Sequence, residues 1–336
     1  MTQWWLAPLV LLISLLMTAG LRRYALARSI IDIPNARSSH VVPTPRGGGV
    51  AIVVSFLLAL VGLGAGGLLE AHAVLAVAGA GGLIAIIGFM DDHGHIAARW
   101  RLLGHFIAAA WGLFWLGGLP PLTVFGGEID LGWAGSIIAA VYLVWLLNLY
   151  NFMDGIDGIA SVEAICVCLG ACGVYWLGGY EQLMVLPVIL IMAVGGFLYW
   201  NFPPAKIFMG DAGSGFLGIA LGLLSLQAAW VSSELFWCWL ILLGVFIVDA
   251  TFTLIRRLLR GDKVYEAHRS HAYQFASRRV GGHLPVTLAV ALLTLCWLLP
   301  VAACVMLFDI DGFVGLLVAY VPLVGLALAY NAGGVE

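Results

Sequence analysis

The chain has 336 residues, of which 62% are hydrophobic and only 10% charged, with a mean hydropathy of +1.05 and a formal net charge of −3. Soluble globular domains carry about a quarter charged residues, so this composition excludes a water-soluble protein and predicts an integral membrane protein. No run of basic residues favours a nucleic-acid partner. The six cysteines lie in apolar stretches without a CxxC pair, which predicts packing residues and neither disulfides nor zinc ligands.

Apolar segments of about 17–25 residues are long enough to cross a bilayer as helices. We expect eleven such helices, which makes the fold an all-α polytopic membrane bundle. The segments lie near 4–21, 47–69, 73–90, 102–119, 133–149, 162–178, 184–200, 213–231, 235–255, 284–308 and 312–330. The first is not a signal peptide, because its basic residues follow the apolar run instead of preceding it. It predicts a retained helix with its N-terminus outside.

Basic residues are confined to alternate connections between these segments. All fifteen lysines and arginines lie in or beside the connections near 22–46, 91–101, 148–161, 201–212 and 256–283. Because such residues gather on the cytoplasmic side, we expect these five loops and the C-terminus to be cytoplasmic. We expect the chain, 1–336, to form a single membrane domain with its chemistry on that face.

The third segment ends in the pair Asp91-Asp92, with Arg99 downstream. Adjacent carboxylates at a membrane boundary repel each other and resist burial. A cation or a proton would relieve both costs, although a solvated helix end explains the pair equally well.

The connection after the fifth segment carries four polar residues, each three positions after the last: Asn148, Asn151, Asp154 and Asp157. On a helical path this spacing places them along one side. Carboxylates and carboxamides supply the hard oxygen ligands that Mg²⁺ prefers. The pattern favours a metal or substrate site over a solvated loop.

The connection after the seventh segment runs from Asn201 through Lys206 to Asp211. Pro203 and Pro204 end one helix and Gly213 opens the next. Asp211 is therefore expected near a helix N-terminus, where backbone N–H groups also favour phosphate. Helix capping and metal binding are both open to this carboxylate.

The longest of the five connections carries His268, Arg269 and His271. Two imidazoles beside an arginine suit a diphosphate, although a basic patch that attracts anionic lipid is a competing interpretation. In the first connection, Arg37, His40 and Arg46 could reach a phosphate, while topology alone would explain the arginines.

Asp249 lies inside the ninth segment. A carboxylate at membrane depth is a candidate functional residue, and an ion pair with Arg256 is the alternative.

Taken in order, the motifs resemble those of the polyprenyl-phosphate N-acetylhexosamine-1-phosphate transferases, of the glycosyltransferase family 4 type. The resemblance rests on Asp91-Asp92, Asn148-x-x-Asn151-x-x-Asp154-Gly-x-Asp157-Gly-x-Ala160, Phe208-Met-Gly-Asp211-x-Gly-Ser214 and His268-x-x-His271. It implies a UDP-N-acetylhexosamine donor, undecaprenyl phosphate as acceptor, UMP as product and Mg²⁺ as cofactor, with Mn²⁺ as an alternative. It implies an enzyme of the inner (cytoplasmic) membrane, for which a homodimer is one option.

The resemblance also assigns roles. Asp211 and Asn151 would hold the metal, and Asp91 and Asp92 would serve the lipid phosphate. Asp154 and Asp157 would line the nucleotide side, and His268 and His271 would lie near the diphosphate. Asn148, Asn201, Lys206, Arg99, Arg269, Arg37 and His40 are the remaining candidates for substrate binding.

The segment Glu266-Ala-His-Arg-Ser-His-Ala-Tyr-Gln274 is similar to the branch that starts O-antigen synthesis, where GlcNAc, FucNAc or QuiNAc donors occur. A phospho-MurNAc-pentapeptide transferase is an alternative. So are an ion-coupled transporter and an inactive, lipid-binding homologue. Direct attack by the acceptor phosphate, assisted by Asp91, is favoured over a covalent aspartyl-phosphate route.

Overall fold

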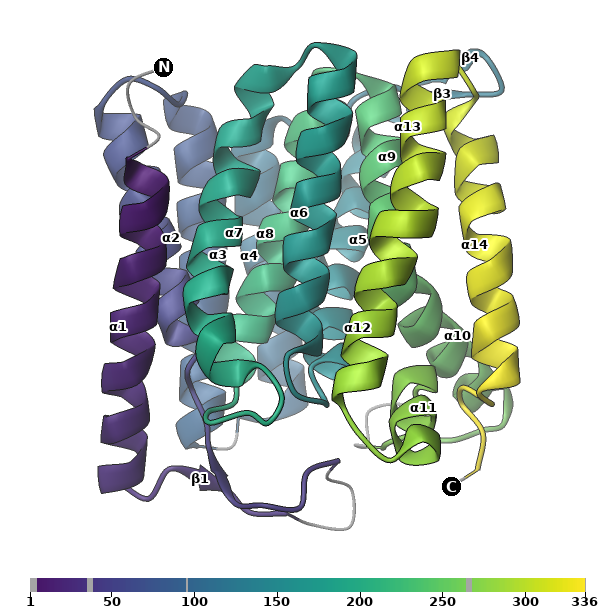
Figure 1. Cartoon of the computed structure of the whole chain (residues 1–336). Helices are drawn as coiled ribbons and strands as arrows, with labels where there is room; N and C mark the ends of the chain where they lie inside the picture. Colours follow the sequence, from purple (N-terminus) through teal and green to yellow (C-terminus); the bar gives the residue numbers. More distant parts are fainter. Residues whose placement is uncertain (1–4, 35–38, 95, 264–267, 336) are drawn as a thin grey trace.

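The computed structural model describes residues 5–34, 39–94, 96–263 and 268–335. Most of them are helical, in a bundle whose helices run roughly along one axis (Figure 1). The helices are α1 (Leu6–Ala27), α2 (Val50–Ala65), α3 (Ala71–His93), α4 (Ala98–Leu116), α5 (Gly132–Met153), α6 (Ile159–Gly178), α7 (Val185–Asn201), α8 (Asp211–Ala229), α9 (Ser233–Leu242), α10 (Gly244–Leu259), α11 (Ala272–Val280), α12 (Leu284–Leu293), α13 (Leu299–Phe308) and α14 (Gly312–Ala329).

Two shorter helical stretches join these helices. The 3₁₀ turn η1 (Glu181–Met184) leads into α7, and the π-helical stretch η2 (Thr294–Leu298) joins α12 to α13. Two antiparallel strand pairs lie in connections: β1 (Ile31–Asp32) with β2 (Thr44–Pro45), and β3 (Leu122–Val124) with β4 (Gly127–Ile129).

Helices occupy all eleven ranges expected from the sequence. In the part of the chain that the structure describes, eight helical spans are long and apolar enough to cross a membrane, and the pair α9–α10 makes a ninth. These observations confirm a polytopic, all-α membrane protein. The two remaining ranges hold α2, which has only 16 residues, and α4, which carries Arg99 and Arg101 in its first turn.

Helix α8 forms the centre of the bundle. It packs against α3 and α5, and nearly all of its residues are buried. Glycines make this close approach possible: a Cβ atom at Gly218 would lie 2.5 Å from the Cα atom of Leu147, and one at Gly81 would lie 2.7 Å from the ring of Phe216. Small residues at helix interfaces are typical of membrane bundles, where van der Waals packing drives association.

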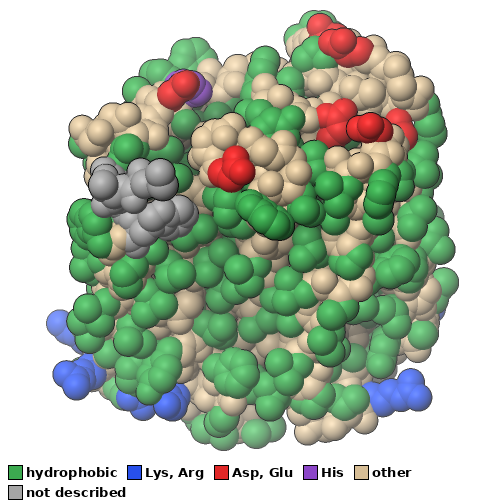
Figure 2. All heavy atoms as spheres, turned by 45° about the horizontal axis from the view of Figure 1, so that its top comes forward, with side chains coloured by type: hydrophobic (Ala, Val, Ile, Leu, Met, Phe, Trp, Pro, Cys, Tyr) green, Lys and Arg blue, Asp and Glu red, His purple; other side chains and the backbone are tan. Residues whose placement is uncertain are grey.

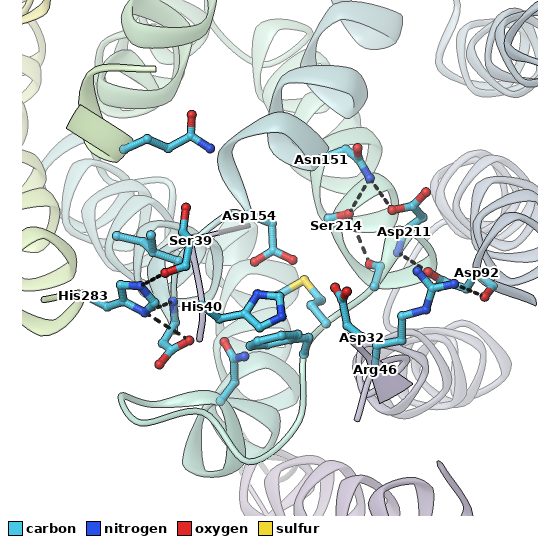
Figure 3. A pocket seen from close by; sticks show the side chains of 18 residues that line it. Asp32, Ser39, His40, Arg46, Asp92, Asn151, Asp154, Asp211, Ser214 and His283 are labelled. Carbon is cyan, nitrogen blue, oxygen red and sulfur yellow. Dashed lines mark hydrogen bonds and ion pairs between the residues drawn. The ribbon is translucent and has the colours of Figure 1, made fainter. Parts of the chain in front are cut away.

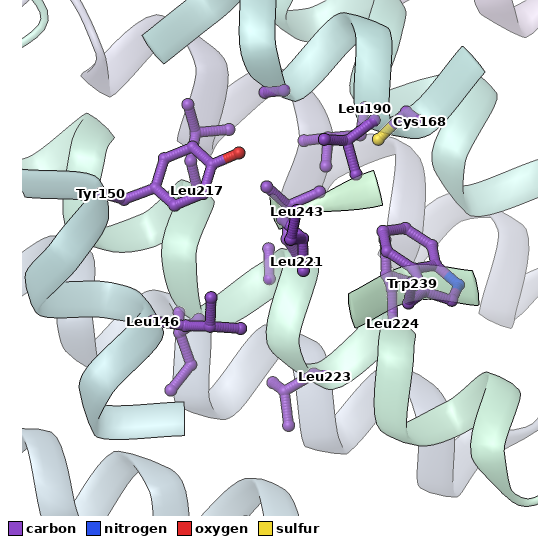
Figure 4. Packing of buried hydrophobic residues seen from close by; sticks show 14 of the residues in the cluster. Leu146, Tyr150, Cys168, Leu190, Leu217, Leu221, Leu223, Leu224, Trp239 and Leu243 are labelled. Atoms are coloured by element: carbon purple, nitrogen blue, oxygen red, sulfur yellow. The ribbon is translucent and has the colours of Figure 1, made fainter. Parts of the chain in front are cut away.

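Around α8, the core is filled by large apolar side chains such as Leu146 and Tyr150 of α5 and Trp239 of α9 (Figure 4). The indole N–H of Trp239 donates to the hydroxyl of Tyr175 at 2.7 Å. All six cysteines are free thiols, and four of them are buried.

Two elements differ from the sequence prediction. The ninth segment, expected as one helix over 235–255, is broken at Leu243 into α9 and α10, with a 68° bend between them. The predicted loop 256–283 contains the helix α11. This helix is short and charged, so the search for long apolar segments did not predict it.

Charge divides the bundle into two ends. At the end where α1 begins, the connections carry acidic residues; the opposite end carries the basic residues (Figure 2). We call these the acidic end and the basic end. An apolar surface lies between them, as expected for a protein with its middle in hydrocarbon. Connections at the acidic end carry Glu70, Glu128, Asp130, Glu181, Glu234, Asp309 and Asp311.

Candidate active site

A polar cavity of about 230 Å³ opens at the basic end, where the connections after α1, α3, α5 and α7 meet the N-termini of α8, α11 and α12 (Figure 3). Carboxylates and other polar groups dominate its wall. The lining residues are Asp32, Ser39, His40, Arg46, Asp92, Asn151, Asp154, Gly155, Ile156, Asp157, Asn201, Phe208, Met209, Gly210, Asp211, Ser214, Gln274 and His283.

The N-terminus of α8 is capped by a carboxylate from α3. Asp92 accepts the backbone N–H of Asp211 at 3.2 Å and that of Ala212 at 3.4 Å. Gly210 precedes them with φ +78°, in the left-handed region that favours glycine. The N–H groups that the sequence analysis expected to bind phosphate therefore donate to Asp92 instead. The guanidinium of Arg46 donates to the backbone carbonyl of Asp92 and ties the first connection to the end of α3.

Asp211 lies at the centre of a small polar network. The amide of Asn151, at the end of α5, donates to Asp211 Oδ1 at 2.8 Å and to Ser214 Oγ at 3.1 Å (Figure 3). This arrangement leaves the amide oxygen of Asn151 and the second carboxylate oxygen of Asp211 for other partners. The guanidinium of Arg101 approaches that second oxygen to 3.8 Å.

A smaller pocket of about 30 Å³ lies on the other side of Asp211. Its polar lining includes Asp91, Arg101 and Asn148, and Asp91 forms an ion pair with Arg101. Asn151 and Asp211 line both this pocket and the larger cavity. The adjacent residues Asp91 and Asp92 thus serve different compartments, because consecutive side chains on a helix point about 100° apart.

The connection between α5 and α6 brings two further carboxylates to the cavity. Burial raises the pKa of Asp154 well above its usual value, and the nearby carboxylates of Asp211, Asp92 and Asp157 raise it further. A bound cation would reverse this shift, because an opposite charge favours the ionised form.

The carboxylate of Asp157 is held by groups from two other segments. The ring of His283, at the start of α12, lies 3.2 Å from Asp157 Oδ1 and 3.1 Å from the carbonyl oxygen of Ser39. The carboxylate of Asp157 raises the pKa of His283. The backbone N–H of Ala205 donates to Asp157 Oδ2 at 3.1 Å. His283 thereby joins the first connection, the α5–α6 connection and α12.

Asn201 joins the two most polar connections. Its amide oxygen accepts the backbone N–H of Gly158 at 3.0 Å, and its amide nitrogen donates to the carbonyl of Ile207 at 2.9 Å. Both side-chain groups are therefore used in holding the backbone. The geometry gives Asn201 a positioning role in this structure.

The connection between α1 and α2 is hydrogen-bonded to the connection between α7 and α8. Phe208 donates its N–H to the carbonyl of Pro45 at 2.8 Å, and Gly48 returns a bond to the carbonyl of Phe208 at 2.9 Å. The ring of His40 packs edge-on against Phe208, with centroids 4.8 Å apart. His40 Nε2 is buried without a hydrogen-bond partner among the described residues, beside the cavity that His40 lines.

Several predicted site residues do not line either pocket. Arg99 and Lys206 are exposed and lie over aromatic rings. His271 is buried, and its ring stacks on that of His268 with centroids 4.9 Å apart. Arg269 accepts a bond from Arg278 through its carbonyl. The substrate-binding roles of these residues stay predictions; Arg37 lies outside the described residues.

Asp249 has a structural partner different from the one suggested. Its carboxylate accepts the N–H groups of Ala272 at 2.8 Å and Tyr273 at 3.0 Å, so it caps α11. Arg256 instead donates to Asn331 and Ala332 near the C-terminus. The expected Asp249–Arg256 pair is not among the interactions of the described residues.

Sequence reasoning assigned no role to several polar residues that the structure places at the site, among them Asp32, Ser39, Arg101, His105, Gln274 and His283. Gln274 stands three residues after His271, in the motif that carried the resemblance. Arg101 follows the acidic pair by ten residues, and only the fold shows that it turns back to Asp91.

The oxygen atoms of Asp211 and Asn151 fit a Mg²⁺ ion that is completed by water and substrate phosphates. No three His, Cys, Asp or Glu side chains in the described ranges form a ready-made metal site. Mg²⁺ does not require one, because it keeps several waters and binds through one or two carboxylates plus substrate phosphates. Asp211 and Asn151 offer two oxygens between the pockets, and the mutually unfavourable carboxylates around Asp154 would be relieved by a cation.

Comparison with known proteins identifies the family. Residues 74–229 match the model of glycosyl transferase family 4. A Bacillus subtilis protein named "probable undecaprenyl-phosphate N-acetylglucosaminyl 1-phosphate transferase" is 31% identical over 273 residues, which cover 78% of this chain and 74% of that protein. A decaprenyl-phosphate N-acetylglucosaminephosphotransferase from Mycolicibacterium smegmatis is 33% identical over 295 residues, covering 75% and 71%.

More distant similarity reaches a second group. A phospho-N-acetylmuramoyl-pentapeptide-transferase from Shouchella clausii is 28% identical over 251 residues, which cover 68% of this chain and 74% of that protein. The family match includes the acidic pair of α3, the polar connection after α5 and the start of α8. These segments build the two pockets around Asp211. By its sequence and by the segments that form its polar cavity, the chain belongs to glycosyl transferase family 4.

Proposed function

We propose that the protein transfers an N-acetylhexosamine 1-phosphate from a UDP-sugar to undecaprenyl phosphate, with release of UMP. One observation carries the proposal: Asp211 and Asn151 form a shared wall between a larger polar cavity and a smaller pocket. A transfer between two substrates needs such a point, at which both phosphates meet one group of ligands. The names of the relatives from Bacillus subtilis and Mycolicibacterium smegmatis support this reaction and a GlcNAc donor.

The larger cavity is assigned to the UDP-sugar. It has room for polar groups, and its wall contains Arg46 and the Nε2 atom of His40, which has no hydrogen-bond partner among the described residues. Asp157 and Asp154 are expected on its nucleotide side. Because Asp92 already caps α8, the diphosphate charge has to be met by a cation and by arginine instead of by the helix N-terminus.

The smaller pocket is assigned to the acceptor phosphate. Arg101 lies between Asp91 and Asp211 in this pocket. Its guanidinium can form a bidentate contact with a phosphate. Asp91 then orients Arg101 and receives the residual proton of the phosphate. A phosphate monoester has a second pKa of about 6, so base assistance contributes modestly and direct attack is favoured over a covalent aspartyl intermediate.

Asp211 Oδ2 and Asn151 Oδ1 would hold Mg²⁺ or Mn²⁺ between the two pockets. When bound, the ion supplies Lewis-acid polarisation of the diphosphate and charge neutralisation of departing UMP. The protein supplies position: α8 carries Asp211, α5 carries Asn151, and the hydrogen bond between them fixes their spacing. Phosphoryl transfer relies on such positioning and electrostatics more than on covalent chemistry.

The proposal includes a topology. Eleven crossings, counting α2 and α4, place the N-terminus outside and the C-terminus in the cytoplasm of the producing cell. The basic end, with the polar cavity, then faces the cytoplasm across the inner membrane, where UDP-sugars are made. The product would start an O-antigen or another surface polysaccharide.

The test is UMP release by the purified protein with undecaprenyl phosphate, Mg²⁺ and a panel of UDP-GlcNAc, UDP-FucNAc, UDP-QuiNAc and UDP-MurNAc-pentapeptide. We expect release that requires both lipid and metal. Asp211→Asn should lower it by more than about a hundredfold, the scale on which loss of one preorganised electrostatic group acts. Glu181→Gln, at the exposed acidic end, is the matched carboxylate control and should keep full activity. Near-normal turnover of Asp211→Asn would remove the metal assignment, and silence across the panel would overturn the transferase.

A further inference from the structure

A second and larger cavity lies away from the polar site, between α12 and α14. It measures about 510 Å³, and α10 and α11 form its floor. Apolar side chains make up most of its wall. The lining residues are Met153, Val245, Val248, Asp249, Ala272, Tyr273, Ala276, Val280, Pro285, Val286, Ala289, Val290, Leu292, Leu293, Cys296, Trp297, Leu323, Leu326, Ala327 and Tyr330. We call it the lateral crevice.

The crevice opens sideways, toward the membrane. Leu292 is 62% exposed and Leu326 38% exposed, on the two helices that border its mouth, and Cys296 is exposed beside them. The opening arises because α13 packs against α14 near the acidic end, whereas α10 lies against α14 nearer the basic end.

Hydrocarbon is the expected filling of this space. An apolar cavity is a poor site for water, and its size falls within the range of about 300–1,000 Å³ typical of small-molecule sites. In a membrane, the molecules that reach a lateral opening are lipid chains.

A wall separates the crevice from the polar cavity. Met153 and Tyr273 line the crevice and are both buried, with exposures of 0% and 4%. Their sequence neighbours Asp154 and Gln274 line the polar cavity on the other side. The hydroxyl of Tyr273 donates to the carbonyl of Phe152 at 2.9 Å and holds the wall closed. This wall divides the crevice from the larger cavity. The smaller pocket, assigned to the acceptor phosphate, shares no described lining residue with the crevice, so we do not assign the crevice to the acceptor.

An exposed basic residue of α11 stands next in sequence to a residue that lines the crevice. Val280, at the end of α11, lines the crevice, and exposed Arg279 is next to it, three positions after the lining residue Ala276. Residues three apart lie on neighbouring parts of a helix face. Tyr330, which directly follows α14, also lines the crevice. A basic group beside an apolar slot is complementary to an anionic head group with its chain.

We propose that the lateral crevice binds one acyl chain of an anionic phospholipid, with the head group at Arg279. This lipid takes no part in the proposed transfer as a substrate. It packs against the crevice face of α11, and α11 brings Gln274 to the polar cavity. The proposal stands on the crevice and does not depend on the reaction.

The experiment uses the full-length protein in nanodiscs that contain a trace of phosphatidylglycerol or phosphatidylcholine with a diazirine in the acyl chain. After illumination, mass spectrometry locates the labelled peptides. We expect label on α12 and α14 within 286–297 and 323–330, about fivefold stronger with phosphatidylglycerol, the preference that one basic residue provides at a membrane surface. Arg279→Gln should remove the preference and keep the label.

A pair of variants tests the crevice itself. Ala289 is exposed and lines the crevice, whereas Leu288 is exposed on the same helix and does not. Ala289→Trp should fill the slot and reduce the label by about tenfold, a loss that corresponds to about two buried methylene groups. Leu288→Trp should keep the label.

Four outcomes would overturn the proposal. Label spread evenly over the lipid-facing helices would remove the site, and equal label from both phospholipids would remove the anionic head group. Stronger labelling by a photoreactive polyprenyl phosphate would assign the crevice to the acceptor. Loss of the label in Leu288→Trp as well as in Ala289→Trp would show that the crevice geometry is not responsible. Arg279→Gln is a surface change, so the test of the head group does not depend on the tryptophan variants folding.

Discussion

The carboxylate of Asp92 on α3 accepts the backbone N–H of Asp211 on α8 at 3.2 Å, across 119 residues of sequence. The second member of the acidic pair thus fixes the residue proposed to hold the metal. The first member, Asp91, pairs with Arg101 in the smaller pocket. Two adjacent aspartates therefore divide positioning and substrate contact between them.

Asp92→Ala is expected to lower the free energy of unfolding by about 1 kcal/mol, because replacing an N-cap residue by alanine costs about 0.5–2 kcal/mol. The change also releases the turn that carries Asp211, so UMP release should fall with it. Asp92→Asn retains an oxygen acceptor and should recover part of the stability. Thermal unfolding followed by tryptophan fluorescence measures the first effect. An unchanged melting temperature in Asp92→Ala would contradict the capping role.

Gly88→Ala is expected to damage the site through packing alone. A Cβ atom at Gly88 would lie 2.5 Å from the backbone nitrogen of Ala212, at the start of α8. Backbone cannot move aside cheaply, and overpacking of this kind costs about 1–3 kcal/mol. Gly82→Ala on the same helix meets nothing within 4 Å and should leave stability and turnover intact. Equal behaviour of the two variants would show that α3 does not fix the start of α8.

Replacement of His283 is expected to change the pH dependence of stability. Asp157 raises the pKa of His283 above its usual value, so the pair stabilises the fold fully below the unfolded pKa of about 6.5. That stabilisation is lost as the pH rises through the higher folded pKa. The melting temperature of the wild type should therefore exceed that of His283→Gln most near pH 6, and the gap should narrow at alkaline pH.

The control for this measurement is His72→Gln at the acidic end, where the His72–Glu70 pair is largely exposed. Exposed pairs contribute little, so this variant should follow the wild type at every pH. A gap that is constant with pH in His283→Gln would show that the contact with Asp157 does not depend on protonation.

The proposed orientation predicts accessibility from outside the cell. In a background lacking Cys296 and Cys304, a cysteine at Glu128 of the exposed β4 strand should react with a membrane-impermeant thiol reagent in intact cells. A cysteine at Arg269 should react only after the cells are opened. The reverse pattern would invert the topology.

The helical bundle could be predicted from the sequence because membrane-spanning helices appear in it as long apolar runs. The alternation of polar and apolar connections also predicted that Asp91, Asn151, Asp154 and Asp211 would meet at one end, and the structure brings them together. These predictions depend only on the end of the bundle at which each loop lies. They do not depend on the direction in which a side chain points.

Side-chain direction is where sequence reasoning fell short. His268 and His271 lie at the correct end but turn to stack on each other, whereas His283, which followed the recognised motif, reaches the cavity. Helix α11 exists because Asp249 caps it from another helix, and such a partner is invisible in a local pattern. The 68° bend between α9 and α10 is likewise invisible in a local pattern, since the apolar run continues through Leu243.

That bend has a consequence for the surrounding bilayer. Helix α9 has 10 residues, which span about 15 Å, half of a hydrocarbon core about 30 Å thick. Helix α10 then leaves the axis at mid-depth and exposes Ile255, Leu258 and Leu259 beside its arginines. We expect α10 to displace more lipid from the leaflet at the basic end than from the opposite leaflet. The protein is then expected to thin that leaflet and to favour membranes whose curvature accommodates the difference.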